Sequence, residues 1–226
     1  MKLSIIVPAH NESANLKLLV PQIDTILSTL NEEYEIIVVD NASTDDTLEI
    51  LNILKRQFSS VISVFEPKKG FGSAILAGLA RSQGDVIGYI HADNQMEAMD
   101  IVRIYQKLKL ENLDICKATR ADRYDGIMRW VISRVYNLLF RAMFHVRLRD
   151  INGSPKLFTR NFFYAAHITS RDWFIDPEII IKAQRRGARM GEVMIHTKPR
   201  EHGSSQVRAT TVLEFLKNMF YYWRQK

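Results

Sequence analysis

The chain has almost no cysteine: Cys116 is the only one among 226 residues. A single cysteine excludes an internal disulfide framework and a zinc cluster built on cysteine ligands. The composition therefore fits a reducing compartment, and no catalytic role is indicated for this thiol.

Long hydrophobic runs are also lacking. The best candidate for a membrane span is interrupted by Arg134, Arg141 and His145, so it is not apolar enough to cross a bilayer. The N-terminus runs directly into a strand pattern at residues 3–8 and has no secretory cleavage signal. We therefore expect a cytoplasmic protein that is at most peripheral on the cytoplasmic face of a membrane.

Acidic residues are fewer than basic ones, with 25 Asp and Glu against 31 Lys and Arg, a net charge of +6. This balance suggests an anionic partner: nucleic acid, acidic lipid or a phosphorylated small molecule. The basic residues form no recognised nucleic-acid-binding motif, so we expect no nucleic-acid partner. The length suits one domain or a core with a C-terminal appendage.

The first half of the chain alternates β-branched runs with helical periods. This pattern predicts strands at 3–8, 35–40, 61–65 and 85–90, and helices at 15–30, 47–58 and 73–82. Such an order is typical of a doubly wound parallel sheet, in which ligands bind beyond the carboxyl ends of the strands. Unusual polar residues stand at those ends, at 10–12, 40–41 and 91–93.

Each of these groups has more than one interpretation. Asp40 ends a continuous apolar strand, where a carboxylate could accept hydrogen bonds from a base or ribose. Asp93 follows a buried strand and could hold a divalent ion near a phosphate. Residues 68–73 are rich in glycine and lysine and favour either a phosphate site or a simple turn. Asn11 and Glu12 could merely start a helix, and residues 43–46 look like a capping box.

Seven segments share a wider pattern, and they are residues 5–12, 38–45, 69–72, 91–95, 150–158, 174–178 and 200–205. In this order they resemble glycosyltransferase family 2, and most of all its dolichol-phosphate mannosyltransferase branch. The resemblance covers residues 3 to about 207. The ordered set is far more specific than any one of its members.

The resemblance implies an α/β GT-A fold: a Rossmann-like, mostly parallel sheet flanked by helices, with amphipathic helices toward the C-terminal half. The GT-A domain would span 1–207, including acceptor helices at about 127–148, and 208–226 would be a C-terminal amphipathic helix. The implied reaction is an inverting, metal-dependent transfer of mannose or glucose to a polyprenyl phosphate. Its donor would be a nucleotide sugar, GDP-mannose or UDP-glucose, and its cofactor Mg²⁺ or Mn²⁺.

Roles for individual residues follow from the same resemblance. The donor contacts would be Pro8, Asn11, Glu12, Asp40, Lys69, Gly70 and Ser205. The metal would lie on Asp93 and Gln95, with His91 as a further candidate. The catalytic set would be Asp93, Asp176, Glu178 and Arg200. The acceptor phosphate would be held by Arg120, Arg129 and Ser133.

The chain departs from the branch at a few positions. His91 stands where an aspartate is common, and a nitrogen ligand there would favour Mn²⁺ over Mg²⁺. The alternative is that His91 only forms hydrogen bonds near the donor. Asn41 replaces a frequent second acidic residue, and Gln206 stands where a lysine often follows the serine. Both changes could weaken or retune donor recognition.

Two amphipathic segments bear on the acceptor. Placed on a helix, residues 128–148 show a narrow polar stripe of Arg134, Asn137, Arg141 and His145 on an otherwise apolar circumference. This arrangement suits a core helix or a helix in a membrane interface. Residues 212–223 form a second apolar arc that could dock on the domain, mediate dimerisation or meet a membrane surface. A membrane-spanning partner subunit could supply an anchor.

The acceptor decides between mechanisms. A phosphate is already anionic near neutral pH and needs no strong base, whereas an alcohol requires one, for which Asp176 and Glu178 are candidates. Three interpretations remain open: a polyprenyl-phosphate glycosyltransferase, a transferase acting on a hydroxyl of a glycan or lipid, and a catalytically weak nucleotide-sugar-binding subunit.

Overall fold

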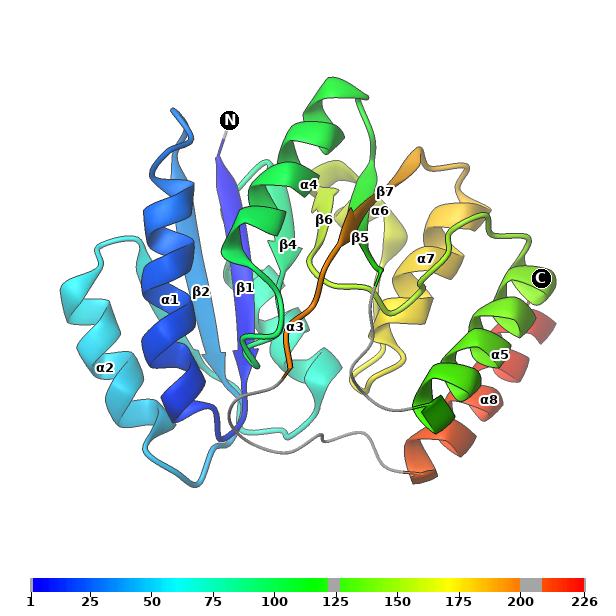
Figure 1. Cartoon of the computed structure of the whole chain (residues 1–226), viewed down its shortest axis with the longest axis horizontal. Coiled ribbons are helices and arrows are strands. Elements are labelled where there is room, and N and C mark those ends of the chain that lie inside the picture. The colour runs from blue at the N-terminus through cyan, green and yellow to red at the C-terminus, as the bar shows by residue number, and fades with distance from the viewer. Residues whose placement is uncertain (1, 122–126, 200–208, 226) are drawn as a thin grey trace.

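The structure of the chain is a computed structural model (Figure 1). It describes residues 2–121, 127–199 and 209–225, and the side chains of all of these except 127–130 and 209–213. The predictions for Arg200, Ser205 and Gln206 therefore concern residues outside this description, as does the prediction for the side chain of Arg129.

One seven-stranded sheet organises the described chain, in the order β3-β2-β1-β4-β6-β5-β7. Its strands are β1 (Leu3–Ala9), β2 (Tyr34–Asp40), β3 (Val61–Phe65), β4 (Val86–Tyr89), β5 (Ile115–Arg120), β6 (Lys156–Thr159) and β7 (Met190–Ile195). β6 runs antiparallel to both of its neighbours, and the other adjacent pairs are parallel. The predicted α/β fold with a mostly parallel sheet is confirmed.

Helices cover both faces of the sheet. They are α1 (Ser13–Leu27), α2 (Thr47–Gln57), α3 (Phe71–Arg81), α4 (Ala98–Leu110), α5 (Ile127–Phe144), α6 (Arg160–Ala166), α7 (Ile175–Arg185) and α8 (Ala209–Arg224). Helices α1, α2 and α4 share one core cluster with the sheet, and α3, α5, α6, α7 and α8 share the other. Along β2, Ile36 and Val38 face the first cluster and Ile37 and Val39 the second. A strand covered on both faces is apolar throughout, which is why these strands read as continuous hydrophobic runs.

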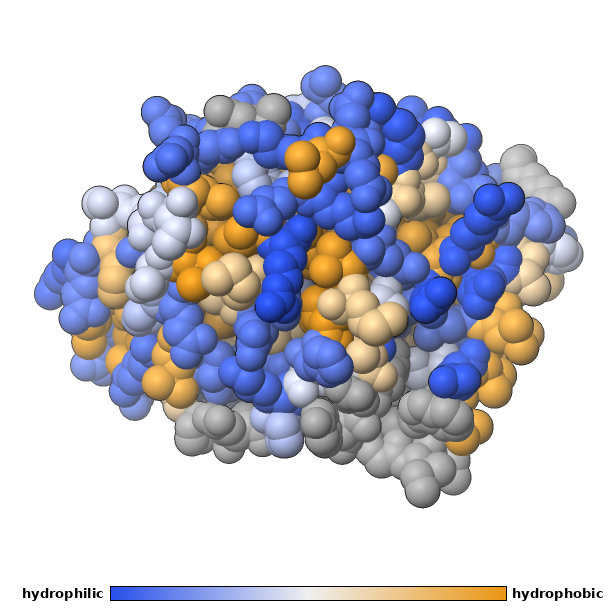
Figure 2. All heavy atoms as spheres, turned by 45° about the horizontal axis from the view of Figure 1, so that its top comes forward, coloured by the Kyte–Doolittle hydropathy of each residue, from blue (hydrophilic) through white to orange (hydrophobic). Residues whose placement is uncertain are grey.

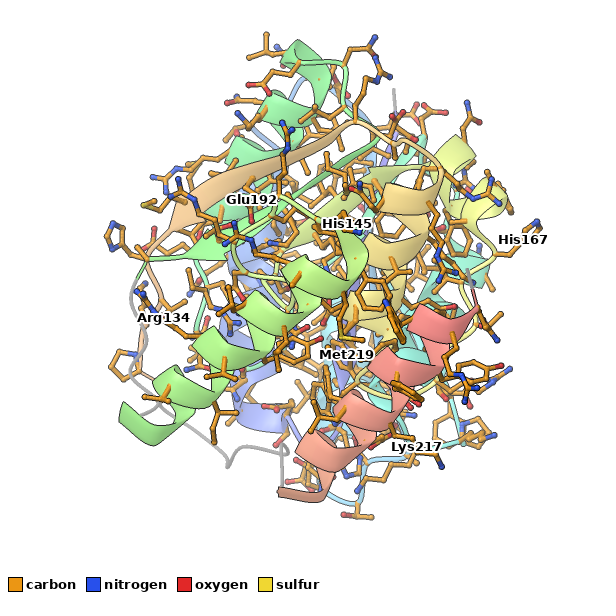
Figure 3. The ribbon with its side chains drawn as sticks, turned by 90° about the vertical axis from the view of Figure 1, so that its right-hand side faces the viewer. Arg134, His145, His167, Glu192, Lys217 and Met219 are labelled. Carbon is orange, nitrogen blue, oxygen red and sulfur yellow. The ribbon has the colours of Figure 1, made fainter. Side chains whose placement is uncertain are left out.

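Helices α5 and α8 lie side by side at one end of the sheet (Figure 3). Their inner stripe is buried: Phe140 is 0% exposed, Phe144 8% and Met219 2%. Tyr136 of α5 contacts Phe215 of α8 edge to face, with ring centroids 5.5 Å apart. Both helices begin near the lower edge of Figure 1, the edge toward which β1 and β2 point. The two amphipathic segments thus pack on each other and on the core.

Their outer stripe remains exposed, and we call it the α5/α8 surface. It consists of Val131, Ile132, Val135, Leu138 and Leu139 of α5 and Leu216, Phe220, Tyr221 and Trp223 of α8, each at least 40% exposed. Figure 3 shows Arg134 and Lys217 on opposite flanks of the helix pair, with Met219 between the helices. In Figure 2 the side of the molecule that these helices occupy carries orange side chains among blue ones. Within the described residues, no helix combines the length and apolarity needed to cross a bilayer.

Candidate active site

The carboxyl ends of β1, β2 and β4 meet at one edge of the sheet. β1 lies between the other two, with Ala9 paired to Asp40 and Ile6 to Tyr89. This edge carries Asp40, which is 2% exposed and accepts a hydrogen bond from the Ser43 amide at 3.0 Å. Pro8 lies inside β1 beside it, opposite Val39. Strand order alone therefore brings together the residues that were predicted to contact the donor, such as Pro8 and Asp40.

The loops after β1 and β2 are tied together by side chains. Asn11 has a positive φ of 57° and accepts a hydrogen bond from the Thr44 amide at 2.7 Å. The Glu12 amide donates to Thr47, and its carboxylate accepts from Asn15. Asn11 and Glu12 thus have local structural partners at the start of α1, as the simpler interpretation predicted. Both residues directly follow β1, at the edge of the sheet where β2 also ends.

Asn41 acts as a clamp on the loop between β3 and α3. Its Nδ2 donates to the carbonyl oxygens of Glu66 at 3.1 Å and Lys68 at 2.8 Å, and its Oδ1 accepts from the Gly70 amide at 2.8 Å. A carboxylate cannot donate to those two carbonyls. An asparagine at this position is therefore explained by its hydrogen bonds to the loop. The sequence alone does not reveal them, because the partners lie about 25 to 29 residues away.

Lys69 is held over the same edge by His10. The Lys69 Nζ lies 2.7 Å from His10 Nε2, and His10 Nδ1 lies 2.9 Å from the Asn41 carbonyl oxygen. Since a lysine ammonium can only donate, Nε2 accepts and Nδ1 carries the proton that bonds to Asn41. The His10 ring therefore holds the Lys69 ammonium close to Asn41, at the carboxyl end of β2. The sequence offered Lys69 as a phosphate ligand but no partner for it.

The two glycines around Phe71 allow close backbone approach to the segment before α7. A Cβ on Gly70 would lie 2.5 Å from the Arg171 oxygen, and one on Gly72 would lie 2.4 Å from the Ser170 oxygen. The amide of Ser73 donates to the Arg171 oxygen at 3.0 Å. This loop is thus a docking surface for another part of the chain. Gly70 stays close to the donor side through its bond to Asn41.

The candidate metal ligands follow β4. Asp93 is 6% exposed, and its Oδ1 accepts from the Gln95 amide at 3.3 Å. Gln95 donates Nε2 to the Lys198 carbonyl at 3.2 Å, which leaves its Oε1 as the oxygen able to ligate. The described residues hold no group of three or more His, Cys, Asp or Glu side chains arranged for a metal. One carboxylate and one amide oxygen still suit Mg²⁺ or Mn²⁺, because such ions commonly take their other ligands from substrate phosphates and water.

His91 sits among aromatic side chains. Its ring contacts Phe71 edge to face, with centroids 4.9 Å apart, and Trp173 stacks on Phe71 at 4.4 Å. Part of His91 reaches the surface, but its Nε2 is buried without a hydrogen-bond partner. Burial lowers the pKa of His91, against the opposing effect of Asp93 and Asp176.

Asp176 is part of a buried ion pair. Its Oδ1 accepts hydrogen bonds from Lys156 Nζ and from the Tyr89 hydroxyl. Lys156 and Tyr89 are 0% exposed, and Asp176 is 3% exposed. Burial lowers the pKa of Lys156, and the Asp176 carboxylate acts in the opposite direction. The motif that contains Lys156 was visible in the sequence, but its role was not, because the pair joins β6 to α7.

Glu178 binds the loop that precedes α7. Its carboxylate accepts from the amides of Thr169 at 3.0 Å and Ser170 at 2.6 Å, and it pairs with Lys182 at 2.7 Å. Burial alone would raise the pKa of Glu178, but the bonds from Lys182 and Ser170 outweigh it and lower the pKa. Glu178 therefore remains ionised and holds this loop against α7.

Arg120, predicted to hold the acceptor phosphate, lies at the end of β5. Arg120 is 24% exposed and forms a two-pronged contact with Asp150, at 2.8 Å from Nε and 3.0 Å from Nη2. Ser133, on α5, accepts a hydrogen bond from Asn137 at its hydroxyl and at its carbonyl. Asn137 in turn accepts from the Ile151 amide at 2.9 Å, which ties α5 to the loop before β6. The sequence singled out Arg120 and Ser133 but gave Asp150 no role.

The chain was compared with known proteins. Residues 4–173 match the family Glycosyl transferase family 2. Curated relatives include the undecaprenyl-phosphate 4-deoxy-4-formamido-L-arabinose transferases of Yersinia enterocolitica and Yersinia pestis, each 28% identical over 96% of this chain. The matched region spans 66% of the length of these relatives.

Solved structures with the same fold include glucosyl-3-phosphoglycerate synthase from Mycobacterium tuberculosis. Its complex with Mn²⁺, UDP and phosphoglyceric acid has a TM-score of 0.79 at 15% identity, covering 98% of this chain and 78% of that one. Its complex with Mg²⁺ and UDP has a TM-score of 0.76 at 16% identity, covering 98% and 79%. At these identities the likeness shows a shared fold.

Proposed function

Because this chain belongs to glycosyltransferase family 2, we propose that it transfers a hexose from a nucleotide sugar to a polyprenyl phosphate, with inversion at the anomeric carbon. Mannose from GDP-mannose and glucose from UDP-glucose are the two donors to test first. The Yersinia relatives carry undecaprenyl phosphate in their names, which supports this acceptor class.

The observation that carries the proposal is the α5/α8 surface. It joins exposed aliphatic and aromatic side chains, among them Leu138 at 65% and Phe220 at 52% exposure, to flanking cations such as Arg134 and Lys217. Apolar side chains beside cations suit the interface of an anionic membrane, where a polyprenyl chain resides. Both helices begin at the edge of the sheet that carries the candidate site. A lipid acceptor could therefore pass from this surface to the site.

The state of the two candidate bases also favours a phosphate acceptor. Asp176 is paired with Lys156, and Glu178 is paired with Lys182 and bound by the Thr169–Ser170 loop. Both carboxylates are therefore engaged by cationic partners, whereas a hydroxyl acceptor requires a base that can take its proton. A phosphate monoester is anionic near neutral pH and needs none.

In the proposed site, Asp40, Glu12 and Pro8 contact the nucleoside, and Lys69 faces the diphosphate. Asp93 and Gln95 would hold Mg²⁺ or Mn²⁺, which when bound neutralises charge on the leaving diphosphate.

On the acceptor side, Arg120, Arg129 and Ser133 orient the acceptor phosphate. One of its oxygens forms the new bond to the anomeric carbon as the bond to the donor diphosphate breaks, and Arg200 would stabilise the charge that develops there. Asn11, Gly70 and Ser205 complete the donor side in this proposal.

The test is transfer of labelled sugar. Purified protein with Mn²⁺ is incubated with labelled GDP-mannose or UDP-glucose, with and without a polyprenyl phosphate, and label is followed into the organic phase. We expect organic-phase label only with the lipid phosphate, and its loss in Asp93→Asn. Label found only on a hydroxyl acceptor would refute the phosphate acceptor. Donor binding without turnover under every acceptor would favour a binding subunit.

A further inference from the structure

Unpaired buried polar atoms gather at one place in the described structure. In all the described residues, six buried side-chain nitrogen or oxygen atoms lack a hydrogen-bond partner. Four of the six belong to His91, Tyr136, Asn152 and Ser154. Leaving such a group unpaired costs about 1 to 3 kcal/mol, so a concentration of them requires an explanation, and a bound ligand that pairs with them is one.

The strand register brings these residues together. Tyr89 of β4 pairs with Lys156 of β6 in antiparallel register. His91 comes two residues after Tyr89 and Ser154 two residues before Lys156, so both leave the same strand pair at the same end. Asn152 follows Ile151, whose carbonyl oxygen accepts from Lys156 Nζ at 3.3 Å. Three of the four atoms are thus grouped around the end of the β4–β6 pair.

The Lys156–Asp176 ion pair is the common neighbour. The charges of Asp176 and Lys156 both act on His91, and burial together with the charges of Asp176 and Asp150 raises the pKa of Tyr136 well above its usual value. Tyr136 precedes Asn137, whose side-chain oxygen accepts a hydrogen bond from the Ile151 amide at 2.9 Å, so α5 meets this part of the chain one residue before Asn152. Asp93 is two residues from His91, so this group adjoins the proposed diphosphate position.

Three ion pairs lie around this group. Lys156 is paired with Asp176, Lys117 with Glu192 at 3.3 Å, and Arg120 with Asp150. The groups that lack partners are an imidazole nitrogen, two hydroxyls and an amide oxygen, and none of them belongs to a carboxylate or an ammonium group. Such groups suit the hydroxyls of a neutral sugar. A carboxylate on the ligand would meet no unpaired cation among these pairs, and it would lie close to Asp176.

We propose that His91, Tyr136, Asn152 and Ser154 form the subsite for the transferred sugar, that this subsite selects an uncharged sugar over a uronic acid, and that His91 acts on the sugar and not as a metal ligand. The inference rests on the proposed nucleotide-sugar donor. It assigns the histidine that replaces a common aspartate to the sugar, while Asp93 and Gln95 serve the metal.

The test separates sugar binding from nucleotide binding. Dissociation constants are measured calorimetrically with Mn²⁺ for UDP, UDP-glucose and UDP-glucuronate, and for GDP, GDP-mannose and GDP-mannuronate. In wild type the uronate should bind at least about tenfold more weakly than its neutral counterpart. In Tyr136→Phe and Ser154→Ala, affinity for the neutral nucleotide sugar should fall about three- to tenfold, as expected for one lost hydrogen bond. Affinity for the free nucleotide should stay within about twofold.

Stability provides an independent readout. Tyr136→Phe and Ser154→Ala each remove a hydroxyl that has no partner in the free protein, so neither variant should have a lower Tm than wild type. A purely structural role would lower Tm and affinity for free nucleotide together. Tyr164→Phe, at a 60% exposed tyrosine on α6, is the matched control and should leave every dissociation constant unchanged.

His91→Ala decides between metal and sugar. Weaker binding of the neutral nucleotide sugar with unchanged binding of Mn²⁺ and free nucleotide is the expected result. Equal weakening of both would make His91 a ligand of the metal or diphosphate and overturn the assignment. Equal binding of uronate and neutral sugar would overturn the selectivity. Wild-type protein that binds neither UDP nor GDP would refute the proposed donor itself, a result distinct from nucleotide binding without sugar discrimination.

Discussion

The buried ion pair between Lys156 and Asp176 gives the sharpest stability prediction. Lys156→Met removes the cation and leaves the Asp176 carboxylate, whose side chain is 4% exposed, with Tyr89 as its remaining donor in the described structure. Removing one partner of a buried pair typically costs about 3 to 5 kcal/mol, because the other charge stays buried without compensation. Against a total stability of about 5 to 15 kcal/mol, that loss is large.

The double variant shows whether loss of the ion pair causes the destabilisation. In Lys156→Met with Asp176→Asn, no uncompensated charge remains, and the asparagine oxygen can still accept from the Tyr89 hydroxyl. Replacing both members of a buried pair is often close to neutral, so the double variant should be less destabilised than either single one. The coupling energy should therefore be at least about 2 kcal/mol.

Urea unfolding at pH 7, followed by far-UV circular dichroism, measures these differences. Lys182→Met is the matched control, because Lys182 is 20% exposed and its partner Glu178 keeps bonds from Thr169 and Ser170. It should cost less than Lys156→Met. Two single effects that simply add in the double variant would show that Lys156 and Asp176 do not depend on each other, and would refute the reasoning.

Three further predictions concern other parts of the structure. The pKa of Glu178 is lowered from its ordinary value of 4.5 in the folded state, so its stabilisation is complete above pH 4.5 and is lost as pH falls through the folded value. The free energy of unfolding of wild type should therefore exceed that of Glu178→Gln by about 1 to 3 kcal/mol at pH 7 and by less in acid. A difference that stays constant across a pH series of urea titrations would contradict this. Gly72→Ala puts a Cβ 2.4 Å from the Ser170 oxygen and should lower the free energy of unfolding by about 1 to 3 kcal/mol. An unchanged Tm in thermal unfolding would contradict this. Leu138→Glu should reduce sedimentation with anionic phospholipid vesicles while leaving donor affinity unchanged, and undiminished sedimentation would argue against a membrane role for the α5/α8 surface.

Local sequence pattern predicted the N-terminal half of the fold well. The strand predicted at 61–65 coincides with β3, and the one at 3–8 lies within β1, which extends to Ala9. Helix boundaries differ by up to three residues, as for the helix predicted at 15–30 and observed at Ser13–Leu27. These elements alternate β-branched runs with amphipathic helices, so each is determined by residues close together in the chain.

The second half needed contacts that local pattern does not contain. β6 is only four residues long and runs antiparallel between β4 and β5, and β5 pairs with β7 about 75 residues away. The α5 segment was compatible with a core helix or an interface helix. The structure shows that one stripe of it packs in the core, where Phe140 is buried, while a second stripe is exposed, with Leu138 at 65%.

By itself the sequence determined which polar residues lie at one edge of the sheet, because the carboxyl ends of parallel strands meet at the same edge. Asp40 and Asp93 could be placed there from strand order. Only the tertiary structure decided what surrounds them. It paired Lys156 with Asp176, made Asn41 a clamp for a distant loop, and left the His91 nitrogen without a partner. Those outcomes depend on which atoms from remote segments of the chain come close together. Where such atoms are also buried, their charges and hydrogen bonds depend on one another.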